Sequence, residues 1–294
     1  MLKPVFLQIQ STGSAVSLLR IVGSSIDHAD QIDEIPEMDS TGRPVYPKKH
    51  DISFDHVDFS YDKRPILKNV NVTIPDRTTT AIIGPGGSGK TTPCSLIARF
   101  WDVGSGSVRI DGTDIREYTL ESLMDQISMV FQNVYLFADT IENNIKFGKP
   151  DADHEQVVAA AKKACCHDFI SALPKGYDTV IGEGGATLSG GEKQRISIAR
   201  AMLKKAPIII FDEATANVDP ENEDKLQKAM EELMCDKTIL MIAHRLKTVQ
   251  KADQILVLDE GRIVQKGTHE ELKDTPGIYR DFLEVRKEAA GWKL

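Results

Sequence analysis

The chain has 294 residues, of which 41% are hydrophobic and 27% are charged, as in a soluble globular protein with a sizeable core. The net charge of -8 and the sequence pI of about 5.5 exclude the basic footprint of a nucleic-acid-binding domain, so we expect no nucleic acid partner. The four cysteines form no C-x-x-C pair, which indicates reduced thiols in a cytosolic protein. The apolar runs have the length of strands, and the N-terminus lacks the apolar core of a signal peptide.

Residues 1–50 are expected to lie outside the globular domain. A helix is predicted up to about residue 27, because Val16, Leu19, Val22 and Ile26 recur at steps of three and four residues. Residues 28–50 are polar, acidic and interrupted by three prolines, which is typical of an extended linker.

Residues 51–294 predict a single α/β domain. The predicted strands are 52–59, 69–74, 79–83, 107–111, 207–212, 237–242 and 254–259, with a hairpin at 261–265. The predicted helices are one from about Lys90 and those at 119–126, 139–147, 154–164, 166–173, 191–204, 220–234 and 246–251. Residues of about 119–189 are predicted to form a mostly helical subdomain, and the alternation after it predicts a largely parallel sheet.

A phosphate-binding pattern, G-x-x-x-x-G-K-[ST], follows the strand that ends at Ile83. Glycines let successive backbone N–H groups turn toward phosphates, a lysine brings a full positive charge, and a hydroxyl can bind Mg²⁺. The alternative is a glycine-rich turn without a ligand. The candidate nucleotide-binding residues here are Gly84, Pro85, Gly86, Gly87, Ser88, Gly89, Lys90, Thr91 and Thr92.

Two carboxylates end the apolar run at residues 208–211. Asp212 is placed to hold Mg²⁺ through water, and Glu213 is the candidate general base for an attacking water. The alternative is an ordinary strand that is followed by an acidic helix cap.

A second candidate anion site lies at Ser189, Gly190 and Gly191, before an apolar helix. One nucleotide does not need two anion sites so far apart in the sequence. A dimer does, if each nucleotide lies between the phosphate loop of one chain and the Ser-Gly-Gly turn of the other. A plain helix-capping turn would explain these residues, but it would not explain why the chain has a second anion site.

Together these motifs resemble the ABC ATPases, whose signature is similar to Leu188–Glu192, and the resemblance covers about residues 51–294. It implies a RecA-like P-loop α/β core with an N-terminal antiparallel β subdomain and an inserted α-helical subdomain. It also implies ATP and Mg²⁺ as cofactors, and a second ABC ATPase domain, identical or related, as partner.

Smaller motifs occur in the order that this family has. Tyr61 resembles the aromatic residue that stacks on adenine, and Gln132 the glutamine that touches Mg²⁺ and the water. Asp219 resembles the aspartate that works across the dimer interface, and His244 the histidine that contacts the γ-phosphate. The resemblance thus implies that the catalytic residues are Lys90, Gln132, Glu213 and His244. It implies that the residues that bind the metal are Thr91, Gln132 and Asp212. Alternatively, Tyr61 could serve packing and His244 could cap a strand.

Two segments resemble exporters in particular, residues 137–145 and 182–185. The resemblance implies that this ATPase domain powers export across a membrane, at the cytoplasmic face of the cell membrane, with a membrane-spanning domain absent from this chain. Residues 1–50 then resemble the end of the last membrane helix plus a linker, and a natural N-terminus is the alternative. A soluble ABC ATPase that is not coupled to a transporter is the alternative function. A non-hydrolysing module would require loss of the carboxylate or the histidine.

Three positions depart from the family pattern. Pro93 replaces an aliphatic residue in the first turn of a helix, where proline is tolerated. Asn217 replaces a serine or alanine, and Gly184 replaces an arginine, which puts salt-bridge coupling at residue 184 in doubt. The departures leave the predicted catalytic residues intact, so the sequence predicts an active ATPase.

Overall fold

The computed structural model describes residues 20, 22–27, 30, 41–131, 133–185, 188–212, 220–243 and 246–291. The chain divides into two units between Ser40 and Thr41. In the first unit, the described residues up to Asp27 are helical, as predicted, and Asp30, which the sequence assigns to the linker, is helical as well. Val22 and Ile26 of the predicted apolar stripe are exposed, and Val16 and Leu19 lie outside the described residues. No helix in the described part of the chain is both long and apolar enough to cross a membrane.

Residues 41–50, which the sequence assigns to a linker, belong to the second unit and are hydrogen-bonded to it. The Arg43 N–H donates to the Glu117 carbonyl at 2.8 Å, and the Thr119 N–H donates to the Arg43 carbonyl at 2.9 Å. The Lys48 N–H donates to the Asp111 carboxylate at 3.0 Å. This stretch therefore packs along the edge of the domain that the sequence places from residue 51.

Four strands form an antiparallel sheet in the order β2-β1-β4-β5. They are β1 (Ile52–Ser60), β2 (Pro65–Ile74), β4 (Ser105–Ile110) and β5 (Thr113–Asp114). Buried and exposed residues alternate along β2 from Leu67 to Ile74, with irregularities, as in a sheet with one face in the core. This is the predicted antiparallel β subdomain.

Six strands form the central sheet in the order β10-β9-β3-β8-β7-β6, parallel except for β10. They are β3 (Thr79–Ile83), β6 (Ile127–Phe131), β7 (Ile208–Asp212), β8 (Thr238–Ile242), β9 (Gln254–Asp259) and β10 (Arg262–Gly267). β8 is buried along its whole length, as expected of a parallel strand covered on both faces.

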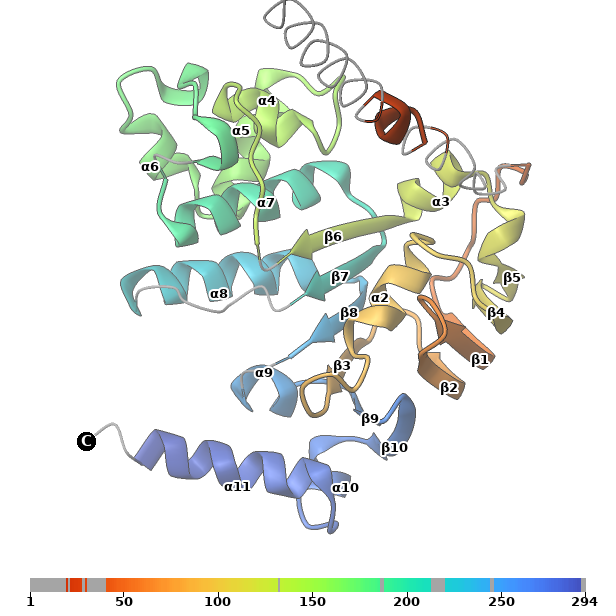
Figure 1. The fold of residues 1–294 in the computed structure, drawn as a ribbon. Coiled ribbons are helices and arrows are strands. Elements are labelled where there is room, and N and C mark those ends of the chain that lie inside the picture. Colours follow the sequence, from red (N-terminus) through yellow and green to blue (C-terminus); the bar gives the residue numbers. More distant parts are fainter. Residues whose placement is uncertain are drawn as a thin grey trace, which may run out of the picture. The chain divides into compact units, whose positions relative to one another are not determined.

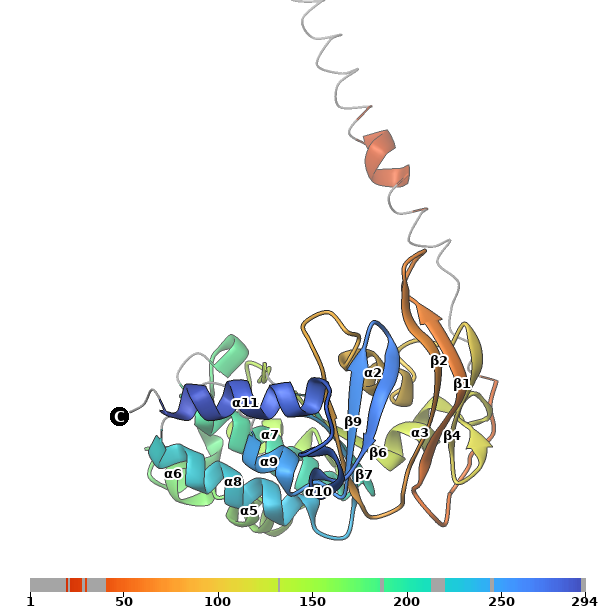
Figure 2. The ribbon, with the colours of Figure 1, turned by 90° about the horizontal axis from the view of Figure 1, so that it is seen from below.

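The central sheet separates two hydrophobic clusters, and successive residues of its strands point to opposite clusters. Ile239 and Met241 of β8 face one cluster, while Leu240 and Ile242 face the other. The first cluster is covered by helices that include α7 and α8, and the second by α2 and the antiparallel sheet. Figures 1 and 2 show this layering, with β1, β2 and β4 on one side and α7, α8 and α11 on the other. The α/β class and the RecA-like core are confirmed.

The helices have the following bounds: α2 (Thr91–Ile97), α3 (Leu120–Gln126), α4 (Ile141–Lys146), α5 (His154–Lys163), α6 (His167–Ser171), α7 (Gly190–Lys204), α8 (Pro220–Met234), α9 (Leu246–Gln250), α10 (His269–Leu272) and α11 (Ile278–Gly291). Short 3-10 turns lie at Ile115–Glu117, Gly176–Asp178 and Glu183–Gly185. Pro93 is a buried residue in the first turn of α2, where its missing N–H would have no intrahelical partner.

The predicted helical subdomain at 119–189 needs a correction, because Ile127–Phe131 is strand β6 at the edge of the central sheet. Its apolar run is short and lies between helices, so it does not differ from a helical turn in periodicity alone. The sequence analysis also missed α10 and α11. A capping box at Thr268 and Glu271 is the signal that could have revealed α10.

Candidate nucleotide site

The first residue of the glycine-rich loop must be glycine, because the neighbouring strand leaves no room for a side chain there. Gly84 follows β3 directly and has φ of 154°. A Cβ at this position would lie 2.0 Å from the carbonyl oxygen of Leu258 in β9, a distance that no side chain can occupy. Gly89 has φ of 94°, and a Cβ there would lie 3.2 Å from the Ile66 carbonyl oxygen. The sheet and the antiparallel subdomain thus fix the course of the loop from both sides.

Lys90 curls back over the loop that precedes it. Its Nζ donates to the carbonyl of Gly84 at 3.0 Å and to that of Pro85 at 2.7 Å. The buried Ser88 hydroxyl has no hydrogen-bond partner within the described part of the chain. A buried hydroxyl without a partner is costly, so a ligand that bonds it would remove that cost. These groups fit a bound phosphate, which needs donors and a positive charge in one place.

Tyr61 lies beside the end of the phosphate loop. Its hydroxyl is 3.4 Å from the Thr92 hydroxyl, and its ring packs edge-on against Trp101 at 5.3 Å between centroids. The side chain remains 42% exposed. An exposed aromatic face at this place can stack on a flat, apolar base.

A cavity of about 390 Å³ opens beside Gly86–Ser88, between the start of β2 and the turn from β9 to β10. Arg64 and Lys68 line it on one side, and Asp259 and Glu260 line it on the other. The sequence analysis did not select these four residues, because charged residues in strand connections are ordinary on a protein surface. Nothing in a local pattern reports that the fold brings them to the phosphate loop.

Asp212 ends β7 within the central sheet, paired with Phe131 of β6 and with Ile242 of β8. Burial raises the pKa of the Cys94 thiol in α2, and the negative charge of Asp212 raises it further. The carboxylate therefore lies near the helix that follows the phosphate loop. This is the place that a metal-binding carboxylate beside a nucleotide should have.

Gln132, Glu213, Asp219 and His244 lie outside the described residues. Three of them follow the described strands closely, since Phe131 ends β6, Asp212 ends β7 and Ala243 follows β8. β6, β7, β8 and β3 are consecutive parallel neighbours in the sheet. Their carboxyl ends share one edge of the sheet, and ligands of open α/β sheets bind at that edge.

Ser189, Gly190 and Gly191 form the start of α7. The Ser189 hydroxyl accepts the Glu192 N–H at 3.3 Å, and the Glu192 carboxylate accepts the Ser189 N–H at 2.8 Å, which completes a capping box. Ser189 and Gly190 are exposed. Figure 1 shows this end of α7 on the side of α6, whereas α2 lies beside β3 and β8. The structure therefore places the two predicted anion sites in different parts of one chain.

Backbone hydrogen bonds connect each exporter-like segment to a residue directly beside the other. The Gly184 N–H donates to the Leu136 carbonyl at 3.0 Å, and the Ile181 N–H donates to the Asp139 carbonyl at 3.0 Å. The Gln194 side-chain amide of α7 donates to the Phe131 carbonyl at 3.3 Å. The stretch after β6, residues 181–185 and the start of α7 are therefore one connected unit.

The fold and the loop define a P-loop nucleotide-binding domain of the α/β class. Residues 67–216 match the family model described as ABC transporter. The chain is 49% identical over 255 residues to an ATP-dependent lipid A-core flippase of Desulfotalea psychrophila, and the match covers 87% of this chain and 44% of the flippase. The flippase of Escherichia coli K12 is 47% identical over 84% of this chain and 43% of its own length.

A solved structure of a bacterial Atm1-family ABC exporter with ATP bound is similar to the chain with a TM-score of 0.83. It is 40% identical, and the match covers 90% of this chain and 48% of the exporter. The chain thus belongs to the ABC transporter family and is an ATP-binding ATPase domain of that family. It spans about half the length of the proteins that it matches.

Proposed function

We propose that two copies of this domain, or this domain and a related one, bind two ATP·Mg²⁺ between them and drive export across a membrane. The observation that carries this proposal is the separation of the phosphate loop from the exposed, capped start of α7. Each of these regions fits an anion, and one chain keeps them apart. A head-to-tail pair would supply both to each nucleotide.

In the proposed reaction, water attacks the γ-phosphorus of ATP, and ADP leaves. Lys90 and the loop amides hold the phosphates, and Tyr61 stacks on adenine. Thr91, Asp212 and Gln132 would hold Mg²⁺, which would neutralise charge on the phosphate oxygens. Glu213 takes the proton of the attacking water, and His244 contacts the γ-phosphate. Ser189, Gly190 and Gly191 of the second chain would close the site, with Asp219 at the interface.

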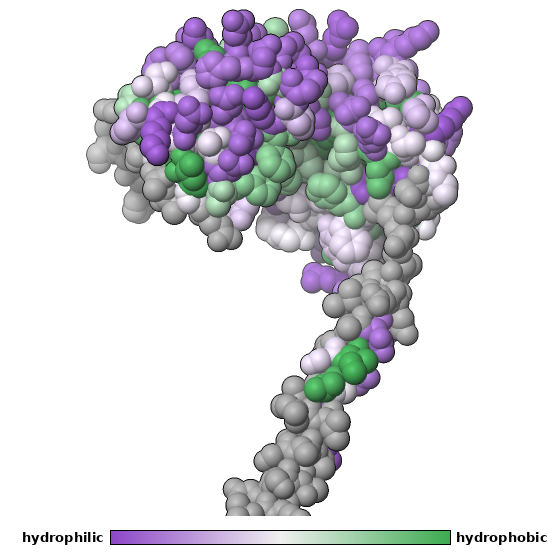
Figure 3. Space-filling view, turned by 90° about the horizontal axis from the view of Figure 1, so that it is seen from above, coloured by the Kyte–Doolittle hydropathy of each residue, from purple (hydrophilic) through white to green (hydrophobic). Residues whose placement is uncertain are grey.

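An aromatic surface after β6 supports a membrane-domain partner. Tyr135, Phe137 and Phe147 are 51%, 40% and 59% exposed. The rings of Phe137 and Phe147 are stacked at 4.3 Å between centroids, and Tyr135 packs edge-on against Phe137. Exposed aromatic clusters of this kind mark interaction sites. Figure 3 views the side on which α4 lies and shows apolar side chains gathered within a largely polar surface.

The position of this aromatic surface links it to the ATP site. It follows β6 and Gln132 in the sequence and is bonded through Leu136 to residue 184. A partner that docks there would respond to changes at the end of β6. The names of the two matched flippases make lipid A-core the first cargo to test.

ATP turnover by the purified domain tests the first part of the proposal. We expect phosphate release with Mg²⁺ and its loss with EDTA, because the proposed site uses a metal. A folded, ATP-binding protein that releases phosphate equally well in EDTA would contradict the role of Mg²⁺.

A chimera tests the coupling to a membrane. The domain would replace the corresponding domain of the Escherichia coli flippase, and flipping of lipid A-core would be measured in vesicles. We expect transport, and we expect Phe137→Ser to reduce it while the ATPase rate of the isolated domain stays unchanged. Robust ATPase activity without transport in the unsubstituted chimera would favour the soluble ABC ATPase instead.

A further inference from the structure

A second cavity, of about 730 Å³, is lined by α5, the end of α7 and α8. Its volume is within the usual range of small-molecule sites. It adjoins Lys237 and Lys205, which precede β8 and β7 in the sequence. The phosphate loop follows the opposite, carboxyl end of the neighbouring strand β3, so this cavity is separate from the nucleotide site.

The cavity has an unbalanced charge. Five lysines and one glutamate line it, Lys149, Lys163, Lys204, Lys205, Lys237 and Glu232, in a chain whose net charge is -8. Glu232 pairs with Lys163 at 2.9 Å. In the part of the chain that the structure describes, no carboxylate forms an ion pair with the other four lysines. The residues that line the cavity thus carry an excess of positive charge.

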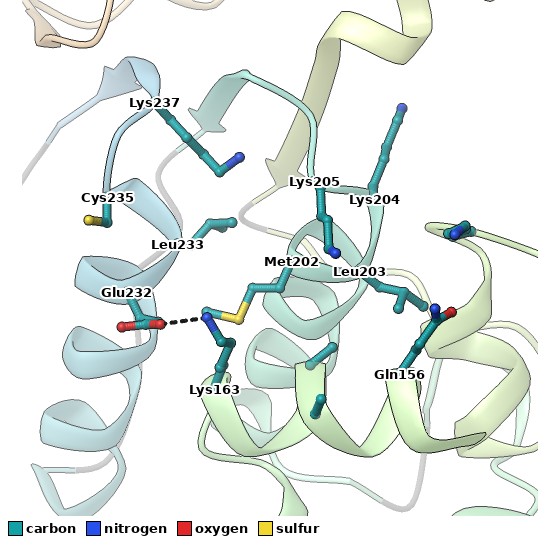
Figure 4. Close-up of a pocket in the computed structure, with 13 residues that line it drawn as sticks. Gln156, Lys163, Met202, Leu203, Lys204, Lys205, Glu232, Leu233, Cys235 and Lys237 are labelled. Atoms are coloured by element: carbon teal, nitrogen blue, oxygen red, sulfur yellow. Dashed lines mark hydrogen bonds and ion pairs between the residues drawn. The ribbon is translucent and has the colours of Figure 1, made fainter. Parts of the chain in front are cut away.

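Three of the ammonium groups converge on the opening. Figure 4 shows Lys163, Lys205 and Lys237 directed toward the space between the helices, while Lys204 points away from it. The Lys237 Nζ donates to the Ala206 carbonyl at 2.6 Å, which accounts for its place beside the end of α7. Burial lowers the pKa of Lys237, so an anion nearby would favour its charged form. Lys163 also has a structural role, since it pairs with Glu232 of α8. The Lys205 ammonium group forms no hydrogen bond or ion pair within the described residues.

The floor of the cavity is apolar. It consists of Ala159 and Ala160 of α5, Met202 and Leu203 of α7 and Leu233 of α8. Leu203 and Leu233 are buried, and Met202 is half-buried. Methionine adapts its shape to different apolar ligands. The lysines form the rim and the aliphatic side chains the base, so the ligand should have a charged end and a hydrocarbon body.

We propose that this cavity binds an amphiphile with a phosphomonoester or similar anionic head and a single hydrocarbon chain. The head would lie among Lys163, Lys205 and Lys237, and the chain would lie on Met202 and Leu233. Lysine binds phosphate as a point charge without demanding one geometry, which suits a rim built from three separate elements. The bound molecule would bridge α5 and α8, as the pair of Lys163 and Glu232 does.

Titration of the purified protein with decyl phosphate, below its micelle concentration, tests the site by calorimetry. We expect one molecule to bind per chain, with decanol and inorganic phosphate each binding at least about tenfold more weakly, since each lacks one half of the recognition. Equal binding of decanol would overturn the role of the lysines. Equal binding of inorganic phosphate would overturn the role of the floor.

Substitutions at the rim and the floor locate the site. The double variant Lys163→Gln/Lys205→Gln and the single variant Met202→Gln should each weaken decyl phosphate binding about tenfold. Lys225→Gln/Lys228→Gln, on the exposed surface of α8, removes the same charge outside the cavity and should leave binding unchanged. ATP binding serves as the check that each variant is folded. Unchanged binding in the rim variant would overturn the proposal.

The same chemistry can come from a free amphiphile or from a lipid in a bilayer. Co-sedimentation with phosphatidylcholine vesicles, with and without phosphatidic acid, separates the two sources. Sedimentation that needs phosphatidic acid and is lost in the rim variant assigns the site to a lipid. Binding of decyl phosphate without sedimentation assigns it to a free molecule, and both results support the cavity as the site.

Discussion

The phosphate loop and the start of α7 are both suited to an anion, but they are built differently. The conformation of the loop is fixed by its surroundings, since Gly84 lies directly against the Leu258 carbonyl. The loop also carries a full positive charge at Lys90. The start of α7 is shaped by its own capping box between Ser189 and Glu192. The loop can hold a phosphate alone, whereas the start of α7 can only add donors to a phosphate that is already held.

The largest effect should follow from removing the charge of the loop. We expect Lys90→Ala to lower ATP turnover roughly 100-fold or more, as loss of a group that stabilises the transferred phosphoryl does. The effect would be measured as phosphate release with Mg²⁺. Lys228→Ala, on the exposed face of α8, is the matched control. Unchanged ATP turnover in Lys90→Ala would contradict the claim that the phosphate loop, unlike the start of α7, holds the phosphate by itself.

The shape of the loop can be broken without touching its charge. A Cβ at Gly84 would collide with Leu258, whereas a Cβ at Gly86 would meet nothing within 4 Å. We expect Gly84→Ala to lower the free energy of unfolding by about 1–3 kcal/mol and to weaken ATP binding, because the backbone must leave a conformation that alanine disfavours. Denaturant unfolding and ATP titration would measure both changes. Similar losses in Gly86→Ala would show that the collision is not the cause.

The smallest effect should come from the cap of α7. We expect Ser189→Ala to lower the free energy of unfolding by about 1 kcal/mol, because the Glu192 N–H loses its acceptor. Ser189→Thr keeps an acceptor and should remain close to the unsubstituted protein. Thermal unfolding compares the two. An equal loss in both variants would indicate that packing at residue 189, and not the hydrogen bond, sustains the start of α7.

The sequence predicted the elements of this fold that have local signatures. The alternation in β1, the loop after β3 and the capping residue Ser189 are each encoded within a few neighbouring positions. The short strand β6 was placed within a helical region, because only its pairing with β7 distinguishes it from a helical turn. The attachment of residues 41–50 was missed for the same reason, since Arg43 and Lys48 are bonded to residues more than 60 positions away.

The residues of the candidate site divide in the same way, into those that have a local sequence signature and those that have none. Lys90 and Asp212 were selected as candidates from motifs, because the chemistry expected of them depends on their immediate neighbours. Arg64 and Lys68 were not found, because their approach to the loop depends on how β2 meets the turn after β9. The cavity between α5 and α8 has no local signature at all, since three separated helices and the turn before β8 contribute to it.

The central claim is that each nucleotide joins the phosphate loop of one chain to the start of α7 of another. It is tested most directly by mixing two variants that both carry Glu213→Gln, which should keep ATP from being hydrolysed. One also carries Lys90→Ala, and the other Ser189→Asp, which retains a good helix cap but adds a charge that repels phosphate. Glu213→Gln alone, which should form a dimer with ATP·Mg²⁺, is the control.

Size-exclusion chromatography with light scattering measures the mass of each sample with ATP·Mg²⁺. We predict that each double variant stays monomeric alone and that the mixture forms a dimer with one chain of each kind. That dimer contains one complete site, made from the loop of the Ser189→Asp chain and the intact α7 start of the Lys90→Ala chain. A mixture that stays monomeric while the control dimerises would contradict the account, as would a Ser189→Asp variant that dimerises alone.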